Sequence, residues 1–319
     1  MTRVACIGEC MIELSPDGER TMRLAYAGDV CNTAVSLARL ARGDATIVQF
    51  VTRLGDERHS EAMLDWWRAE GIDTALVDRL EGRAAGLYLI ELDERGERSF
   101  TYYRSESAAR ALFADDAHGQ AMRDGLRGAG WVYLSGVTVS LLGAAAHERL
   151  LATLDALRGD GTRVGFDTNY RPRGWPDAAI ARERIAAVLD RCDLALPTLD
   201  DERALFGDRD LDGCLERLAG HGVGEVAVKL GDRGACVAYD GAVEHVPPAA
   251  DVEIVDTTGA GDAFDAAYLH ARIAGLDPPA AARAGNELAA VVLGHRGAIA
   301  PEAAVLAAGA RGNGGATPR

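Results

Sequence analysis

The feature that most restricts how this chain can fold is an alternation of two patterns. Short apolar runs alternate with segments in which apolar residues recur at helical spacing. The runs lie at residues 4–8, 46–51, 131–134, 164–166, 194–196, 226–228 and 236–239. Between them, apolar residues recur at helical spacing, as at Leu150, Leu154 and Leu157. Strands joined through helices run parallel, and helices then cover the sheet. The sequence therefore predicts an α/β fold, with a doubly wound, mostly parallel sheet and helices on both faces.

One segment departs from this alternation. Residues 86–92 and 98–104 read as two strands around a turn, which is a β-hairpin signal. Together with residues 11–28 it suggests a small β-sheet lid on the main domain. We therefore expect an α/β core at 1–10, 29–83 and 108–310 and a β lid at 11–28 and 84–107. The polar, glycine-rich residues 311–319 predict a disordered tail.

Composition excludes several functional classes. The formal net charge of −15 argues against nucleic-acid binding, because little would neutralise a phosphate backbone. No apolar run approaches the roughly 18 residues that span a membrane, and the first residues are too short for a secretory signal. Six scattered cysteines without a metal-ligand spacing indicate reduced, buried thiols. These features are typical of a cytoplasmic protein with a small-molecule substrate.

Residues 255–271 (VDTTGAGDAFDAAYLHA) read as a strand end, a tight turn and a helix. Gly259, Ala260 and Gly261 would leave backbone amides open at the positive helix end, which favours phosphate. Asp262 would compete with that anion unless it is a general base that deprotonates a nucleophile beside the phosphate. The alternative is a helix-capping aspartate after ordinary turn glycines.

Polar clusters follow several predicted strands, at the edge where doubly wound sheets bind ligands. After 226–228 come Lys229, Gly231 and Gly234, which could bring a cation and a close backbone turn to nucleotide phosphates. The same residues also read as a simple hairpin turn before 236–239. The chain has no P-loop.

A second group of residues offers contacts for a sugar. Gly28, Asp29 and Asn32 combine close backbone approach with groups that bond to hydroxyls, although Asp29 could instead be a helix N-cap. Tyr102 and Arg104 share one face of the predicted hairpin. Arginine binds carboxylates through paired hydrogen bonds, so these residues favour an acidic sugar, unless the hairpin face is merely exposed.

The string from Asp256 to Asp262 (DTTGAGD) resembles the signature of the ribokinase-like (PfkB) carbohydrate kinases, whose final aspartate is the catalytic base. Other stretches resemble those family members that phosphorylate 2-keto-3-deoxygluconate: GECMIELS at 8–15, AGDVCNTA at 27–34, TYYR at 101–104 and DTNYRP at 167–172. The similarity runs from about residue 3 to 305. It implies the ribokinase-like fold, ATP with Mg²⁺, and phosphorylation of the 6-hydroxyl.

The resemblance also implies roles for individual positions. The sugar acid would be held by Gly28, Asp29, Asn32, Tyr88, Tyr102, Arg104, Arg171 and Asp262. The ATP site would contain Asn169, Thr198, Lys229, Gly231, Gly234, Gly259, Gly261 and Asn286. The family's Asn-x-x-Glu motif, associated with Mg²⁺, reads Thr198-Leu199-Asp200-Asp201 here, which leaves Asp201 as the candidate for the metal.

The sequence therefore predicts a carbohydrate kinase with Asp262 as base and the amides of residues 259–261 as anion hole. Two rivals stay open: a kinase of a neutral sugar such as fructose or ribose, and a catalytically silent sugar-binding regulator. A homo-oligomer, formed as a dimer through the exposed lid strands, is also expected. The configuration at C4 of the substrate is left open.

Overall fold

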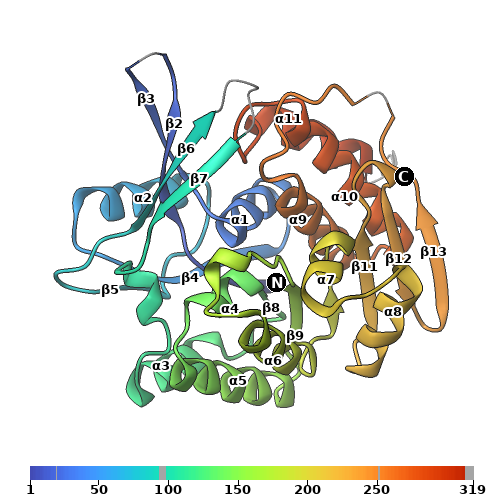
Figure 1. Ribbon diagram of the computed structural model, residues 1–319, viewed down its shortest axis with the longest axis horizontal. Helices are drawn as coiled ribbons and strands as arrows, with labels where there is room; N and C mark the ends of the chain where they lie inside the picture. The colour runs from blue at the N-terminus through green and yellow to red at the C-terminus, as the bar shows by residue number, and fades with distance from the viewer. Residues whose placement is uncertain (19, 93–97, 251, 313–319) are drawn as a thin grey trace.

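The computed structural model describes residues 1–18, 20–92, 98–250 and 252–312. Within these ranges, the main sheet has nine strands in the order β13-β12-β11-β10-β9-β8-β1-β4-β5, parallel except where β12 and β13 join antiparallel at one edge (Figure 1). The predicted doubly wound, mostly parallel sheet is confirmed. The strands are β1 (Thr2–Ile7), β4 (Thr46–Leu54), β5 (Val77–Arg79), β8 (Trp131–Ser135), β9 (Arg163–Asp167), β10 (Leu194–Ala195), β11 (Glu225–Lys229), β12 (Ala235–Tyr239) and β13 (Ala242–Val246).

Helices cover both faces of this sheet, because its central strands are apolar on both sides. Along β1, Val4 and Cys6 belong to one buried cluster, and Ala5 and Ile7 belong to the other. The first cluster packs against α1 (Asp29–Leu40), α2 (Arg58–Ala69), α9 (Ala260–Ile273) and α10 (Pro278–Leu293). The second packs against α3 (Asp116–Leu126), α4 (Gly136–Leu141), α5 (Ala144–Gly159), α6 (Ala178–Leu189), α7 (Leu199–Phe206) and α8 (Leu211–Gly220).

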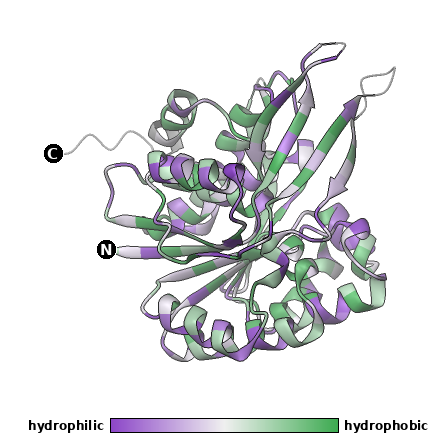
Figure 2. Cartoon of the chain, turned by 90° about the vertical axis from the view of Figure 1, so that its left-hand side faces the viewer, coloured by the Kyte–Doolittle hydropathy of each residue, from purple (hydrophilic) through white to green (hydrophobic). Residues whose placement is uncertain are grey.

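A separate four-stranded sheet, called the lid sheet below, stands away from the main body (Figure 2). Its order is β3-β2-β6-β7, with β2 and β6 parallel and the outer pairs antiparallel. The predicted hairpin at 86–92 and 98–104 is present as β6 and β7. The strands are β2 (Met11–Pro16), β3 (Met22–Ala27), β6 (Gly86–Leu92) and β7 (Arg98–Tyr103), inside the ranges expected for the lid.

The strand predicted immediately before the glycine turn is wrong. Residues 252–255 form no strand, and the side chains of Ile254 and Val255 are 66% and 48% exposed. Instead, the amides of Val255 and Asp256 both donate to the carbonyl of Leu293 at the end of α10, at 2.8 and 3.1 Å. A helix end therefore positions the turn that precedes α9, where we expected a sheet edge.

The remaining expectations concern the chain as a whole. The six cysteines are buried and free, as predicted. Among the described residues, no helix has both the length and the apolar character needed to cross a membrane. Helix α11 (Glu302–Gly312) extends two residues into the predicted tail at 311–319, and residues 313–319 of that tail lie outside the described residues.

Candidate active site

One cleft of about 690 Å³ lies between the main sheet and the lid sheet, and it gathers most of the predicted site residues. Its lining comes from segments far apart in the sequence, including α1, the lid strands, the loop after β9 and the start of α9. The predicted residues that line it are Gly28, Asp29, Asn32, Tyr88, Tyr102, Arg104, Asn169, Arg171, Thr198, Lys229, Gly259, Gly261 and Asp262.

Asp262 lies in the first turn of α9 and faces the cleft. Its side chain does not cap the helix, because Gly259 holds the N-cap position and no side chain caps it. The Asp262 Oδ2 atom instead accepts a hydrogen bond of 2.8 Å from Nδ2 of Asn32 on α1. The alternative of a simple capping aspartate is therefore wrong, and the carboxylate is oriented toward the predicted sugar side of the site.

The surroundings of Asp262 favour its protonated form more than water does. Burial, together with the nearby carboxylates of Asp29 and Asp167, raises the pKa of Asp262 to about 7. The hydrogen bond from Asn32 and the charge of Lys229 lower the pKa of this group. A carboxyl group that titrates near neutral pH is suited to accept a proton from a hydroxyl group.

The turn before α9 requires glycine at position 259. Its backbone is left-handed, with φ of 77°, and a β-carbon there would lie 2.3 Å from the carbonyl oxygen of Ala298. The first amides of a helix have no acceptor within it, so Ala260, Gly261 and Asp262 present open N–H groups at the positive end of α9. This geometry can bind a phosphoryl group next to the Asp262 carboxylate.

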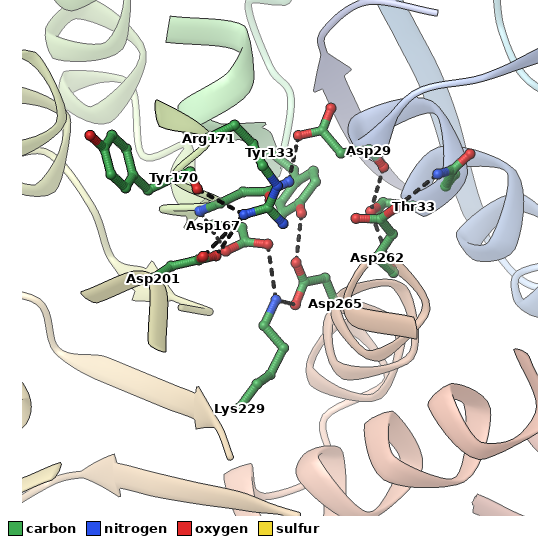
Figure 3. A network of polar contacts seen from close by, with 12 residues as sticks. Asp29, Thr33, Tyr133, Asp167, Tyr170, Arg171, Asp201, Lys229, Asp262 and Asp265 are labelled. Atoms are coloured by element: carbon green, nitrogen blue, oxygen red, sulfur yellow. Dashed lines mark hydrogen bonds and ion pairs between the residues drawn. The ribbon is translucent and has the colours of Figure 1, made fainter. Parts of the chain in front are cut away.

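Lys229 ends β11 and is 7% exposed. Its ammonium donates to Asp167 Oδ2 and Asp265 Oδ1, both at 2.9 Å (Figure 3). Gly231 and Gly234, predicted beside it, do not line the cleft. A β-carbon on Gly234 would lie 2.3 Å from the carbonyl oxygen of Val246, so the turn fits tightly between β11 and β12. The hairpin interpretation of these glycines is confirmed.

Asn169 connects the two sides of the cleft. Its side-chain amide donates to Asp29 Oδ2 at 2.8 Å, and its backbone amide donates to Asp167 Oδ1 at 3.1 Å. Asp29 is the first residue of α1, after Gly28 at the N-cap, and makes no capping bond. The N-cap interpretation of Asp29 is therefore wrong.

At the lid end, the predicted substrate residues already have acidic partners. Tyr88 donates its hydroxyl to Glu13, and Arg104 forms an ion pair with Glu9, whose side chain is 3% exposed. Tyr102 is 44% exposed, and the Arg104 guanidinium lies 5.8 Å from the centre of its ring. A carboxylate bound by Arg104 would therefore share that arginine with Glu9.

Arg171 and the predicted metal residue Asp201 pair with each other. Arg171 Nη1 lies 3.0 and 3.1 Å from the two carboxylate oxygens of Asp201. Binding a cation at Asp201 would require release of this arginine. Thr198, at the N-cap of α7, lines the cleft but offers no carboxylate.

No closed metal cage lies in the cleft among the described residues. Among the described residues, one group of three potential metal ligands lies close together: Glu202, Asp208 and Cys214. Arg217 already forms ion pairs with both carboxylates of this group, with Nη2 2.7 Å from Asp208 Oδ2. The described residues therefore offer no preformed cage of protein ligands for Mg²⁺ in the cleft. Mg²⁺ commonly uses substrate phosphates and water as ligands, together with one or two carboxylates.

Asn286 lies apart from the residues that line the cleft. Its amide donates 2.8 Å to the carbonyl of Pro247, which connects α10 to the segment after β13. A contact between Asn286 and the nucleotide stays a prediction.

Two arginines line the cleft that were not predicted as site residues, Arg110 and Arg173. Arg173 donates 3.3 Å to the carbonyl of Phe100 on the lid strand β7. Among the described residues, the side chain of Arg110 has no hydrogen-bond or ion-pair partner. Arg173 belongs to a polar cluster after a predicted strand and could have been found there. Arg110, in the 3₁₀ turn Ala108–Ala111 after the lid, carries no sequence signal.

The chain is similar to known proteins over nearly its whole length. The model of the pfkB family carbohydrate kinases matches residues 1–304. The 2-dehydro-3-deoxygluconokinase of Escherichia coli strain K12 is 39% identical over 308 residues, which cover 96% of this chain and 99% of that protein. The enzyme of the same name from Dickeya dadantii strain 3937 is 40% identical over 301 residues, which cover 93% and 96%.

A solved structure shows the same fold. A putative ribokinase II from E. coli, in complex with ATP and Mg²⁺, superimposes with a TM-score of 0.83 at 20% identity, and the match covers 98% of this chain and 100% of that one. This structural likeness and the family match agree with each other. The chain belongs to the pfkB family of carbohydrate kinases.

Proposed function

We propose that this carbohydrate kinase transfers the γ-phosphoryl group of ATP to the 6-hydroxyl group of 2-keto-3-deoxygluconate, also called 2-dehydro-3-deoxygluconate. The observation that carries the proposal is the composition of one cleft, with a carboxylate beside open helix amides at one end and arginines at the other. Relatives that are 39–40% identical over nearly the whole chain bear the name of this activity.

The chemistry follows from the first turn of α9. The Asp262 carboxylate accepts the proton of the 6-hydroxyl group, and the hydroxyl oxygen forms a bond to the γ-phosphorus. The bond between the γ-phosphorus and the bridging oxygen of the β-phosphate breaks at the same time, and ADP leaves. The open amides of residues 260–262 stabilise the negative charge on the transferring phosphoryl oxygens. Asn32 orients the carboxylate through its 2.8 Å hydrogen bond.

ATP is the proposed donor, in agreement with the family and with the structural neighbour that binds ATP and Mg²⁺. Mg²⁺ bound to the phosphates would offset their charge. The residues proposed to line the nucleotide side are Asn169, Thr198, Lys229, Gly259 and Gly261, because they lie along the same cleft.

The acid group of the substrate explains the arginines of the cleft. Guanidinium groups bind carboxylates through two parallel hydrogen bonds, whereas a neutral sugar needs no such partner. Arg104 and Arg171 are the proposed contacts, with Tyr88 and Tyr102 beside them. Their pairing with Glu9 and Asp201 leaves the neutral-sugar kinase as the main competing outcome.

A substrate panel tests the proposal. ADP formation is coupled to NADH oxidation and measured with 2-keto-3-deoxygluconate, its C4 epimer from galactonate, fructose and ribose. The proposal expects kcat/KM for one or both keto acids to exceed that for the neutral sugars by at least about 100-fold, as expected when a buried charged group loses its partner. Faster turnover of fructose or ribose would overturn it. Tight binding of the keto acid without ADP formation would favour the silent regulator.

Two further expectations belong to the proposal. Exposed apolar side chains on the outer strands of the lid sheet, Met22 and Leu24 on β3 and Tyr103 on β7, support a homodimer formed through the lid. The buried free cysteines agree with the reducing cytoplasm as its location.

A further inference from the structure

Lys229 is the only lysine of the chain, and its ammonium group is almost completely enclosed. Two carboxylates flank it at 2.9 Å, Asp167 from β9 and Asp265 from α9. The second oxygen of Asp265 accepts a 2.8 Å hydrogen bond from the hydroxyl of Tyr133 on β8, and both of these residues are buried (Figure 3). Burial opposes the charge on Lys229, but the two carboxylates raise its pKa above the ordinary value. The ammonium is therefore already neutralised before any phosphate enters the cleft.

Asp265 connects these contacts to the proposed catalytic base, Asp262, because both residues lie on α9 about one helical turn apart. Asp265 follows Asp262 by three residues on α9, so the two side chains project from neighbouring positions of the same helix face. Because Asp265 is bonded to both Lys229 and Tyr133, the first turn of α9 cannot rotate without breaking buried hydrogen bonds. The direction of the Asp262 side chain is fixed by the same contacts.

The contacts continue around the cleft and return to Asp262. The Asp167 carboxylate accepts a hydrogen bond from the backbone amide of Asn169, and the side-chain amide of Asn169 donates a hydrogen bond to Asp29 on α1. One turn later on α1, Asn32 donates to Asp262. These hydrogen bonds and ion pairs, together with the backbone of α9 and of α1, form a closed ring. Its members on α9 are Asp262 and Asp265, and its members on α1 are Asp29 and Asn32.

We propose that Lys229 is a positioning residue, whose ammonium binds Asp167 and Asp265 instead of the nucleotide phosphates and thereby fixes Asp262 relative to both substrates. This proposal rests on the proposed phosphoryl transfer and replaces the direct role of Lys229 in ATP binding. Lys229 also acts electrostatically. Asp262 is faced by the charges of Asp29 on α1, Asp167 on β9 and Lys229 on β11, and only the last of these favours its ionised form.

The single lysine allows a test that is independent of activity. In protein labelled with ¹³C,¹⁵N-lysine, all lysine side-chain NMR signals belong to residue 229. The proposal expects the ammonium to stay protonated beyond pH 10.4, about the ordinary lysine pKa, and its ¹⁵Nζ shift to change little when Mg²⁺ and a non-hydrolysable ATP analogue are added. Titration near the ordinary value, or a large shift on addition of the analogue, would overturn it. This outcome does not depend on which sugar is the substrate.

Kinetics of Tyr133→Phe provide the second test, since this variant keeps the ring volume and Lys229 itself. We expect kcat to fall about 3- to 30-fold with KM for ATP within about twofold, because a slightly misplaced base slows the chemical step. The matched control is Tyr268→Phe on α9, the helix of Asp262 and Asp265; the Tyr268 hydroxyl donates 2.7 Å to Glu225, outside the cleft. It removes an equivalent hydrogen bond and is expected to leave kcat unchanged. Equal kcat values in the two variants would contradict the proposal.

The double variant Lys229→Met/Asp265→Asn removes the ammonium together with one of its carboxylate partners, so no excess charge is added to the core. Because Lys229 lowers the pKa of Asp262, and Asp265 is not among the charges that shift it most, the double variant is expected to move the acidic limb of kcat to higher pH, with KM for ATP changed less than about threefold. An increase of more than about tenfold in KM for ATP, with the pH profile unmoved, would show that Lys229 binds phosphate directly.

Discussion

The two ends of the cleft hold their charges differently. At the α9 end, Lys229, Asp167 and Asp265 are at most 7% exposed and are joined by bonds of 2.9 Å. At the arginine-lined end, Arg104 pairs with the buried Glu9, but the side chain of Arg171 is 57% exposed and that of Arg110 has no bonded partner among the described residues. The first arrangement is preorganised, because its groups need not move when substrate binds. The exposed arginines of the second arrangement can exchange a protein carboxylate for a substrate carboxylate. This property suits them to binding a charged substrate more than to catalysing the reaction.

The largest effect is expected from Asp262→Asn. Loss of the base should lower kcat about 10²- to 10⁴-fold and leave both KM values within about threefold, because Asn32 and the arginines still hold the sugar. Steady-state kinetics with the keto acid measure both quantities. If kcat stays within tenfold of the wild type, Asp262 is not the base. The preorganised α9 end could then no longer be assigned to catalysis and distinguished in function from the arginine-lined end.

At the lid end, Arg104→Gln should act on KM instead. Loss of a charged hydrogen-bonding group is worth about 1.5–3 kcal/mol, so KM for the keto acid should rise about 10- to 100-fold. The same change leaves the buried Glu9 carboxylate without its partner and should lower the melting temperature. Adding Glu9→Gln should restore stability but not KM. Recovery of KM in the double variant would show that Arg104 acts only through the fold.

Arg110→Gln provides the matched comparison, since the Arg110 side chain has no partner to lose within the described part of the chain. A rise in KM at unchanged melting temperature would show that the unpartnered arginine also contacts the carboxylate.

The pH dependence of catalysis should report the α9 end. Asp262 acts as a base only when ionised, and burial raises its pKa to about 7. We therefore expect kcat/KM to fall about tenfold per pH unit below pH 7 and to level off above it. A profile that is flat down to pH 5 would show that the carboxylate has an ordinary pKa.

Stability should depend on pH in the opposite direction. Because the pKa of Asp262 is higher in the folded chain than in the unfolded one, the folded state binds the extra proton between about pH 4 and pH 7. The contribution of this group to stability is complete below that range and is lost as the pH rises through 7. Asp262→Asn should therefore raise the melting temperature by a few degrees at pH 8 and by less at pH 5. An equal change at both pH values would contradict the raised pKa.

The smallest effect is expected from Asn286→Ala. Its amide is already bonded to the carbonyl of Pro247, so the predicted contact with the nucleotide should be weak and KM for ATP should change less than about twofold. A larger increase would show that Asn286 binds the nucleotide strongly.

The difference between the two ends also shows what a single sequence can reveal. The main sheet, the lid hairpin and the glycine turn were predictable, because their signals lie in consecutive residues. The segment before the glycine turn was predicted as a strand end from its apolar residues, and nothing local shows that Leu293 binds Val255 and Asp256 instead. The two bonds of Lys229 join residues 36 and 62 positions apart, and Asp265 reads as an ordinary polar residue of a helix. Such partners become visible only when the chain is folded.

The central claim is that the arginine-lined end selects an acidic sugar for phosphorylation by the α9 end. A competition reaction tests it most directly: wild-type protein, ATP, Mg²⁺ and equal amounts of 2-keto-3-deoxygluconate and fructose, followed by ³¹P NMR. The account predicts one new phosphomonoester signal, coupled to the C6 protons of the keto acid, in step with ADP formation. A fructose phosphate as the main product, or ADP with inorganic phosphate alone, would contradict it.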